Sequence, residues 1–209
     1  MRTLVHLVRH GEVFNPHDIL YGRLPGYHLS DTGKQMAQVL GEHFRGMDVT
    51  YLVSSPLDRA RETSAPIADA LGLDVATDRR LIEAENQFEG TRFKFRKDGA
   101  LRNVANWRKL VNPFRPSWGE PYAEIASRMN AAINDAYEKA RGHEAVCVSH
   151  QLPIWTARQA IEGNRLWHDP RARQCAVASV TTIEFDDGKI TGIGYATPWG
   201  ATKDSVPGA

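Results

Sequence analysis

Hydrophobic positions along this chain form short apolar runs separated by longer amphipathic segments. The short runs are apolar at nearly every position, as in strands covered on both faces, and they lie at residues 3–8, 51–53, 73–76 and 145–148. The longer segments repeat apolar side chains at helical spacing, and they lie at residues 30–44, 55–71, 120–140 and 153–161. Strands that alternate with helices predict an α/β fold, here a three-layer sandwich with a mostly parallel central sheet.

Local signals mark where several of these elements begin or turn. Ser30 precedes the first helix as an N-cap, and Ser55-Pro56 is expected to cap the second helix, with Pro at its first position. Near the C-terminus, apolar runs over 177–185 and 190–195 flank the polar sequence Asp186-Asp187-Gly188-Lys189. This pattern predicts an antiparallel hairpin at one edge of the sheet.

Residues 86–118 interrupt the alternation with scattered Arg, Lys and aromatic side chains, and we expect an inserted cap segment that folds over the sheet edge. No linker separates this segment, so residues 1–200 are expected to form one domain and residues 201–209 a flexible tail. Residues 91–115 carry eight Arg or Lys and one Asp, although the whole chain has a net charge of only +1. This basic segment is interpreted as a solvated lid, a selector of substrates with a second negative group, or a nucleic-acid contact.

Composition excludes several classes of protein. With 26 Lys plus Arg against 25 Asp plus Glu the chain is not broadly cationic, so no nucleic-acid partner is expected. No apolar run reaches the roughly 18 residues of a membrane span, and the N-terminal run is too short for a signal peptide. Only Cys147 and Cys175 occur, without a CxxC pattern. We therefore expect a cytoplasmic protein without a disulfide framework, a membrane partner or cysteine-bound zinc; a homo-oligomer is left open.

Polar residues follow three of the predicted strands at the carboxyl end, where open α/β sheets bind ligands. Arg9-His10-Gly11-Glu12 follows the first strand, Ser54-Ser55-Pro56 with Arg59 follows the second, and His150 follows the strand that ends at Val148. Arginine forks bind phosphate oxygens, and nearby cations lower the pKa of a histidine, which keeps the ring neutral and nucleophilic. Gly next to the nucleophile lets the backbone approach an anion closely. The pattern favours phosphoryl transfer through a phosphohistidine.

The segment Leu7-Val8-Arg9-His10-Gly11-Glu12 resembles the RHG signature of the histidine phosphatase superfamily, which has the phosphoglycerate-mutase-like fold. Further segments resemble the later motifs of that family in the same order, at residues 54–60, 81–83, 88–90, 119–124 and 148–150. The resemblance spans residues 4–155, about three quarters of the chain.

This resemblance implies a role for each matched residue. His10 is the phosphorylated nucleophile, and Glu83 gives a proton to the leaving oxygen and later activates water. Arg9, Arg59 and His150 form the phosphate pocket. No metal and no other cofactor is expected to take part.

Four more positions follow from the resemblance or from departures from it. Asn15 and Arg23 resemble loop residues that contact the phosphate or lie near the substrate. Gln151 stands where the family usually has Gly, which makes it a candidate substrate contact. The segment between Glu83 and the next motif is one residue short, so Glu85 is a rival acid.

The expected function is therefore a metal-independent phosphatase that acts on a small phosphorylated metabolite. One alternative is a cofactor-dependent phosphoglycerate-type mutase with the same intermediate, although the long mutase-type insertion is missing. The other is a catalytically weak protein that binds a phosphorylated ligand. His6, on the first buried strand, is expected to be a core histidine with satisfied ring nitrogens.

Overall fold

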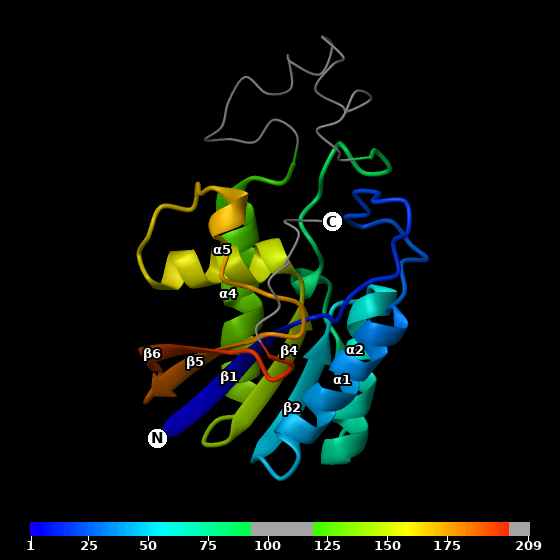
Figure 1. The fold of residues 1–209 in the computed structure, drawn as a ribbon. Helices are drawn as coiled ribbons and strands as arrows, with labels where there is room; N and C mark the ends of the chain where they lie inside the picture. Colours follow the sequence, from blue (N-terminus) through cyan, green and yellow to red (C-terminus); the bar gives the residue numbers. More distant parts are fainter. Residues whose placement is uncertain (93–118, 201–209) are drawn as a thin grey trace.

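The computed structural model describes residues 1–92 and 119–200, which form a three-layer sandwich of helices on both faces of one sheet (Figure 1). The sheet has six strands in the order β3-β2-β4-β1-β5-β6. These strands are β1 (Arg2–Arg9), β2 (Val49–Ser54), β3 (Ala76–Thr77), β4 (Glu144–Ser149), β5 (Val180–Asp186) and β6 (Lys189–Ala196). The helices are α1 (Asp31–Phe44), α2 (Asp58–Leu71), α4 (Tyr122–Lys139) and α5 (Gln151–Ile161), with 3₁₀ turns η1 (Arg79–Leu81) and η4 (Pro170–Ala172). The predicted α/β class is confirmed.

Most of the sheet is parallel, and the hairpin is the exception. Strands β3, β2, β4 and β1 pair in parallel, whereas β5 is antiparallel to β1 and β6 is antiparallel to β5. Asp187 and Gly188 connect β5 to β6 with φ angles of 46° and 79°. Two successive positive φ angles produce the turn that matches the twist of a two-stranded ribbon. The antiparallel edge predicted from the sequence is therefore confirmed.

Successive strand residues face opposite layers, which gives the sheet two apolar cores. On one face, side chains of β1 and β4 pack with α4 and α5, and the buried set includes Val5, Leu7, Ala145, Cys147, Ile125, Met129 and Ile154. On the other face they pack with α1 and α2, and the set includes Val8, Val146, Val148, Met36, Leu40, Leu52 and Ile67. Because helices cover both faces of the central strands, a ligand can approach these strands only at their ends.

His6 is the polar exception inside strand β1. Its Nδ1 lies 2.9 Å from the Thr182 hydroxyl and its Nε2 lies 2.9 Å from the Glu144 carboxylate. The ring also makes an edge-on contact with Phe44, at 5.4 Å between centroids. The prediction of a satisfied core histidine is confirmed, and His6 belongs to the core.

The two predicted helix caps have different outcomes. Ser30 is the N-cap of α1, and its hydroxyl accepts a hydrogen bond from the Gly33 N–H at 2.9 Å. The second helix begins at Asp58, and its N-cap residue is Leu57 without a side-chain bond, so the Ser55-Pro56 cap is wrong. The hydroxyl of Ser55 is bonded to a histidine of the candidate site at 2.8 Å and accepts only a longer bond, at 3.4 Å, from the N–H of Leu57.

The predicted cap segment, residues 86–118, lies largely outside the described residues, as do nearly all of the basic segment 91–115 and the tail 201–209. Its described beginning runs beside the loop that follows β1, because Ile19 forms a β-bridge with Arg92. The single-domain organisation and the role of the cap stay predictions. Among the described helices, none is both long and apolar enough to cross a lipid bilayer.

Candidate active site

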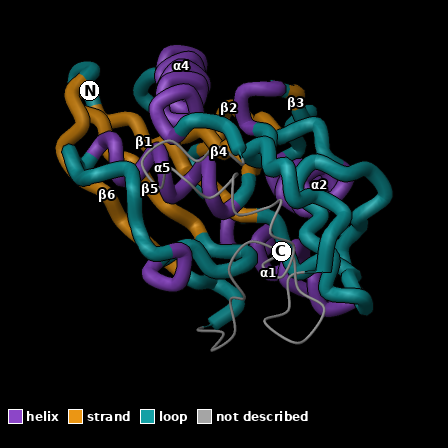
Figure 2. Tube along the Cα trace, turned by 90° about the horizontal axis from the view of Figure 1, so that it is seen from above, coloured by secondary structure: helices purple, strands orange, loops and turns teal. Residues whose placement is uncertain are grey.

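The carboxyl ends of β1, β2 and β4 meet at one edge of the sheet. Arg9 of β1 is paired with Ser149 of β4, and Ser54 of β2 is paired with Val148 of β4. The His10 N–H donates to the Ser149 carbonyl at 3.1 Å, which continues the pairing past the strand end. Figure 2, seen from above, shows these strands side by side beneath the connecting loops. Residues that follow different strands in the sequence are thereby brought together.

His10 is buried, with only 2% of its surface exposed. Its Nδ1 lies 2.8 Å from the Gly11 carbonyl, and a carbonyl oxygen only accepts, so Nδ1 carries the proton of the neutral ring. Nε2 is then the nitrogen with a free electron pair. Burial, followed by the charges of Arg59 and Arg9, lowers the pKa of His10 well below its ordinary value. His10 is therefore a neutral imidazole that can attack an electrophile through Nε2.

His150 lies beside this nucleophile. The centroids of the two rings are 5.0 Å apart, and Nε2 of His150 lies 2.8 Å from the Ser55 hydroxyl. Its Nδ1 is buried and has no hydrogen-bond partner among the residues described. Burial, then the charge of Arg59, lowers the pKa of His150 well below its ordinary value. The site thus holds two buried neutral histidines.

Arg9 and Arg59 are almost completely buried, at 3% and 1% exposure. Arg9 donates one hydrogen bond, to the Cys175 carbonyl at 2.7 Å, and Arg59 donates one, to the Gly22 carbonyl at 2.6 Å. The ring of Tyr21 lies under the Arg59 guanidinium at 4.8 Å. In the described part of the chain, the Nε of each arginine is buried without a partner. Because a guanidinium has five N–H donors and unpaired buried donors are costly, the two arginines form a candidate anion-binding site.

Glu83 is partly buried near both arginines. Its carboxylate accepts a hydrogen bond from the Ala84 N–H at 2.8 Å. Burial raises the pKa of Glu83, and this effect outweighs the Ala84 bond and the charges of Arg59 and Arg9, which lower it. A carboxyl group that keeps its proton to higher pH is suited to general acid catalysis.

The segment around Glu83 is attached to the sheet edge. The Ser149 hydroxyl donates to the Leu81 carbonyl at 2.7 Å, just before the acid. The rival Glu85 has a side chain that is 68% exposed and lies 3.8 Å from Arg23 in an ion pair. The geometry therefore favours Glu83 over Glu85 as the acid.

Asn15 and Arg23 bond to the loops themselves. Both polar atoms of the Asn15 side chain bond to the backbone of Ile19, at 2.8 and 3.0 Å. Arg23 donates to the Glu83 carbonyl at 2.7 Å and to the Glu120 carboxylate at 2.8 Å. Arg23 thus links the acid segment to the start of α4. The expected contacts of these two residues with a substrate stay predictions.

Gln151 is buried at the first position of α5, directly after His150. Its side-chain amide donates to the Cys175 carbonyl at 3.4 Å and accepts from Arg173 at 3.4 Å. It connects the Cys175 carbonyl, to which Arg9 is bonded, to Arg173, which none of the sequence motifs included.

Two hydroxyl groups support the site and were missed as site residues. Thr63 on α2 accepts from the Gly11 N–H at 3.0 Å and donates to the Arg59 carbonyl at 2.7 Å, joining the nucleophile loop to the arginine helix. Ser55 bonds to His150. Ser55 belongs to one of the matching motifs, but its sequence pattern predicts a helix cap. No sequence signal indicates the role of Thr63, which depends on the approach of α2 to the loop after β1.

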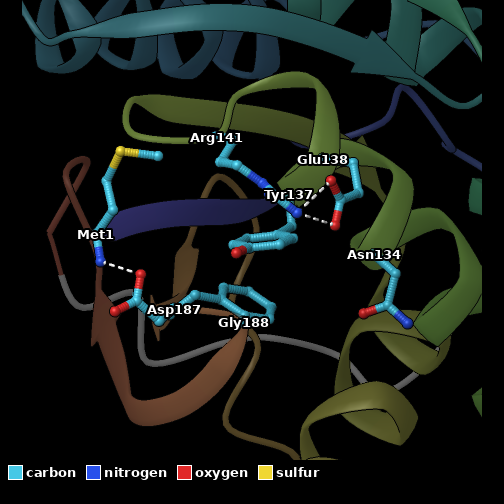
Figure 3. Close-up of a pocket in the computed structure, with 8 residues that line it drawn as sticks. Met1, Asn134, Tyr137, Glu138, Arg141, Asp187 and Gly188 are labelled. Atoms are coloured by element: carbon cyan, nitrogen blue, oxygen red, sulfur yellow. Dashed lines mark hydrogen bonds and ion pairs between the residues drawn. The ribbon is translucent and has the colours of Figure 1, made fainter.

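Two further observations bear on other kinds of site. Residues 1–92 and 119–200 contain no group of three or more His, Cys, Asp or Glu that could hold a metal ion. A cavity of about 450 Å³ lies at the opposite end of the sheet, lined by Met1, Asn134, Tyr137, Glu138, Arg141, Phe185, Asp187 and Gly188 (Figure 3). Its charges are paired with one another, Arg141 with Glu138 and the amino terminus with Asp187. It holds none of the candidate residues.

Comparison with known proteins decides the family. The sequence profile of the histidine phosphatase superfamily (branch 1) matches residues 5–196. The chain belongs to this superfamily. An uncharacterized protein of Mycobacterium tuberculosis (strain ATCC 25618 / H37Rv) is 53% identical over 196 residues, covering 94% of this chain and 96% of that protein. A probable phosphoglycerate mutase of Citrobacter koseri is 34% identical over 183 residues, covering 84% and 83%.

Solved structures have the same fold. A phosphoserine phosphatase of Entamoeba histolytica, in complex with 3-phosphoglyceric acid, superposes with a TM-score of 0.75 at 22% identity, covering 94% of this chain and 98% of that one. A mycobacterial glucosyl-3-phosphoglycerate phosphatase gives a TM-score of 0.71 at 22% identity, covering 88% and 91%. Proteins described as phosphatases therefore share this fold.

Proposed function

We propose that this member of the superfamily is a metal-independent phosphatase that hydrolyses a small phosphate monoester through a phosphohistidine on His10. One observation carries the proposal: Arg9 and Arg59 are buried with unused N–H donors beside a neutral histidine whose Nε2 is free. Two guanidinium charges match the two negative charges of a phosphate monoester. Phosphate oxygens also fit the fork geometry of arginine.

The proposed reaction has two steps. Nε2 of His10 attacks phosphorus, and the bond from phosphorus to the ester oxygen breaks. Glu83 gives its proton to the departing oxygen, which leaves as an alcohol. Arg9, Arg59 and His150 stabilise the charge on the phosphoryl oxygens. Water then attacks phospho-His10, Glu83 takes the water proton, and inorganic phosphate leaves as the nitrogen–phosphorus bond breaks.

A mutase is the second candidate, because the Citrobacter koseri relative is described as a probable phosphoglycerate mutase. The same phosphohistidine would then return its phosphoryl group to a sugar acid instead of water. A phospho-ligand binding protein without useful turnover is the third candidate. Buried arginines around a free nucleophile support the enzymes over the binder, since binding alone does not require a free Nε2.

Trapping the intermediate separates these functions. The full chain would be mixed with a panel of phosphate monoesters in excess chelator, and released phosphate and protein-bound, acid-labile phosphate would both be measured. We expect both signals, and their loss by roughly 10³-fold or more in His10→Ala. His17→Ala, an exposed histidine of the following loop, is the matched control. Retained turnover in His10→Ala contradicts the nucleophile, and loss of activity on chelation contradicts the metal-free mechanism. Exchange between phosphoglycerates that exceeds phosphate release indicates the mutase.

A further inference from the structure

Arg173 lies between η4 and β5 and is held from two sides. Its Nε donates to Nε2 of His168 at 2.8 Å, and its Nη1 donates to the Gln151 side chain at 3.4 Å. Its Nη2 makes no hydrogen bond, and its guanidinium no ion pair, with any residue that the structure describes. Two nitrogens therefore fix the guanidinium, and the third is left available.

His168 is fixed as the acceptor for this arginine. Its Nδ1 donates to the Leu166 carbonyl at 2.7 Å, so Nε2 carries the free electron pair of the neutral ring. The ring lies 5.7 Å from Tyr122 of α4 and 5.8 Å from Trp155 of α5, between centroids. Burial lowers the pKa of His168, which favours the neutral form that accepts from Arg173. The sequence from Leu166 to Pro170 thus builds a support for a guanidinium.

A short network joins Arg173 to the phosphate pocket. The Cys175 carbonyl accepts from Arg9 at 2.7 Å and from Gln151 at 3.4 Å, and Gln151 accepts from Arg173. The positive charge of Arg173 also acts on Glu83 and lowers the pKa of that carboxyl group. Arg173 is therefore connected to Arg9 through Gln151 and the Cys175 carbonyl, and its charge acts on the candidate acid.

The arginines of the site carry more positive charge than a phosphoryl group neutralises. Arg9, Arg59 and Arg173 contribute three positive charges to this end of the sheet. A phosphate monoester dianion balances two of them. One positive charge is left for the leaving group, and a carboxylate supplies one negative charge where a second phosphate would supply two.

We propose that Arg173 binds a carboxylate carried by the leaving group of the substrate, and that His168 and Gln151 are its positioning residues. The proposal rests on the proposed function, because it places the leaving group beside Glu83. It names one residue, outside every sequence motif of the site, as the determinant of substrate choice.

The test compares two esters that differ at one carbon. 3-Phosphoglycerate has a carboxylate where glycerol 3-phosphate has a hydroxymethyl group. In Arg173→Gln we expect kcat/KM for 3-phosphoglycerate to fall about 10- to 100-fold, mainly through KM, and the preference over glycerol 3-phosphate to shrink about tenfold or more. The control Arg171→Gln removes an exposed arginine that is paired with Asp169 on the same loop, and should keep the preference. Equal losses for both esters, or no loss, overturn the proposal.

Binding separates this proposal from catalysis. Calorimetry on His10→Ala would measure the affinity for both esters with and without Arg173→Gln. A carboxylate preference that disappears with Arg173 supports the proposal even if the wild-type chain hydrolyses neither ester, which would contradict only the proposed function. A preference that survives in the double variant, or is absent at the start, overturns the assignment of Arg173.

The positioning role of His168 needs its own pair of variants. The amide oxygen of Gln can replace Nε2 as acceptor, so His168→Gln should keep most of the preference for the carboxylate, whereas His168→Leu should lose it. The effect is expected in KM for 3-phosphoglycerate, with kcat changed less. If both variants behave alike, His168 does not act through its acceptor nitrogen.

Discussion

The imidazole rings of His10 and His150 lie 5.0 Å apart, centroid to centroid, and are tilted by 59°. Both are buried beside Arg9 and Arg59, so a proton on either ring would add a further positive charge next to these two guanidinium groups. This relationship connects the chemistry of the site to the stability of the fold.

The first prediction concerns acid stability. Because the pKa values of His10 and His150 are lowered in the folded state, the unfolded chain binds more protons at pH values between the folded pKa and about 6.5. The free energy of unfolding should therefore fall as the pH drops below about 6.5. Urea denaturation at pH 7.5 and 5.5 measures this slope, and His150→Asn should make it shallower. An unchanged slope in that variant would contradict the assignment.

Glu83 should have the opposite effect on the pH dependence of the free energy of unfolding. Its pKa is raised by burial, so the folded state holds the proton longer than the unfolded chain. The stability that this proton contributes is complete below the ordinary pKa of a glutamate and is lost as the pH rises through the folded pKa. Glu83→Gln should remove this loss in the same urea titrations. A variant that weakens stability equally at every pH would point to a packing defect instead.

Glu83 is also the proposed general acid, and substrates with good and poor leaving groups test this role. Glu83→Gln cannot supply a proton, so we expect kcat to fall roughly 10²-fold or more for alkyl phosphates, which have poor leaving groups. The loss should be much smaller for p-nitrophenyl phosphate, whose leaving group needs little protonation. Glu85→Gln is the matched control, because Glu85 is exposed and paired with Arg23. If Glu85→Gln shows the selective loss instead, the acid is Glu85.

Arg59 is expected to contribute to phosphate binding and to lower the stability of the fold. It is buried, and within residues 1–92 and 119–200 it makes a single hydrogen bond, to the Gly22 carbonyl, while its Nε has no partner. Replacing a poorly paired buried charge by an apolar side chain often stabilises a protein, so Arg59→Met should raise the free energy of unfolding by about 1–2 kcal/mol. Thermal unfolding with and without inorganic phosphate checks both effects, since the phosphate-induced rise in Tm should disappear.

Arg61→Met is the control for this prediction, because Arg61 is exposed on the same helix. It should keep the phosphate-induced rise in Tm and show little change in stability. A destabilised Arg59→Met variant would mean that the contacts with Tyr21 and Gly22 outweigh the cost of burying the charge.

The strand ends were predictable from the sequence because their pattern is local. An apolar run followed by Arg9-His10, or by Ser149-His150, marks both a buried strand and the place where it leaves the sheet. In a parallel sheet these carboxyl ends meet at one edge, so the candidate residues are expected to converge there. The hairpin was equally local, since Asp187-Gly188 contains its own turn geometry.

The residues that hold the site in place could not be predicted from such local patterns. Ser55 has the local pattern of a helix cap, but tertiary contact with His150 assigns its hydroxyl elsewhere. Arg173 and His168 are five residues apart, and nothing in that spacing shows that Gln151, on another element, completes the arrangement. Such contacts depend on how elements dock, and sequence patterns describe single elements.

Gly11 provides the last prediction, because the structure gives this glycine a second role beside the expected one. The sequence suggests that glycine lets the backbone approach an anion, whereas a Cβ at Gly11 would lie 2.7 Å from the Gly33 carbonyl oxygen, inside contact distance. Gly11→Ala must therefore push the nucleophile loop away from the start of α1. We expect a loss of about 1–3 kcal/mol in the free energy of unfolding, together with reduced kcat because His10 moves with the loop. Gly192→Ala on β6 is the control, since its Cβ would meet nothing closer than 3.6 Å. Full stability and activity in Gly11→Ala would show that the loop yields without cost.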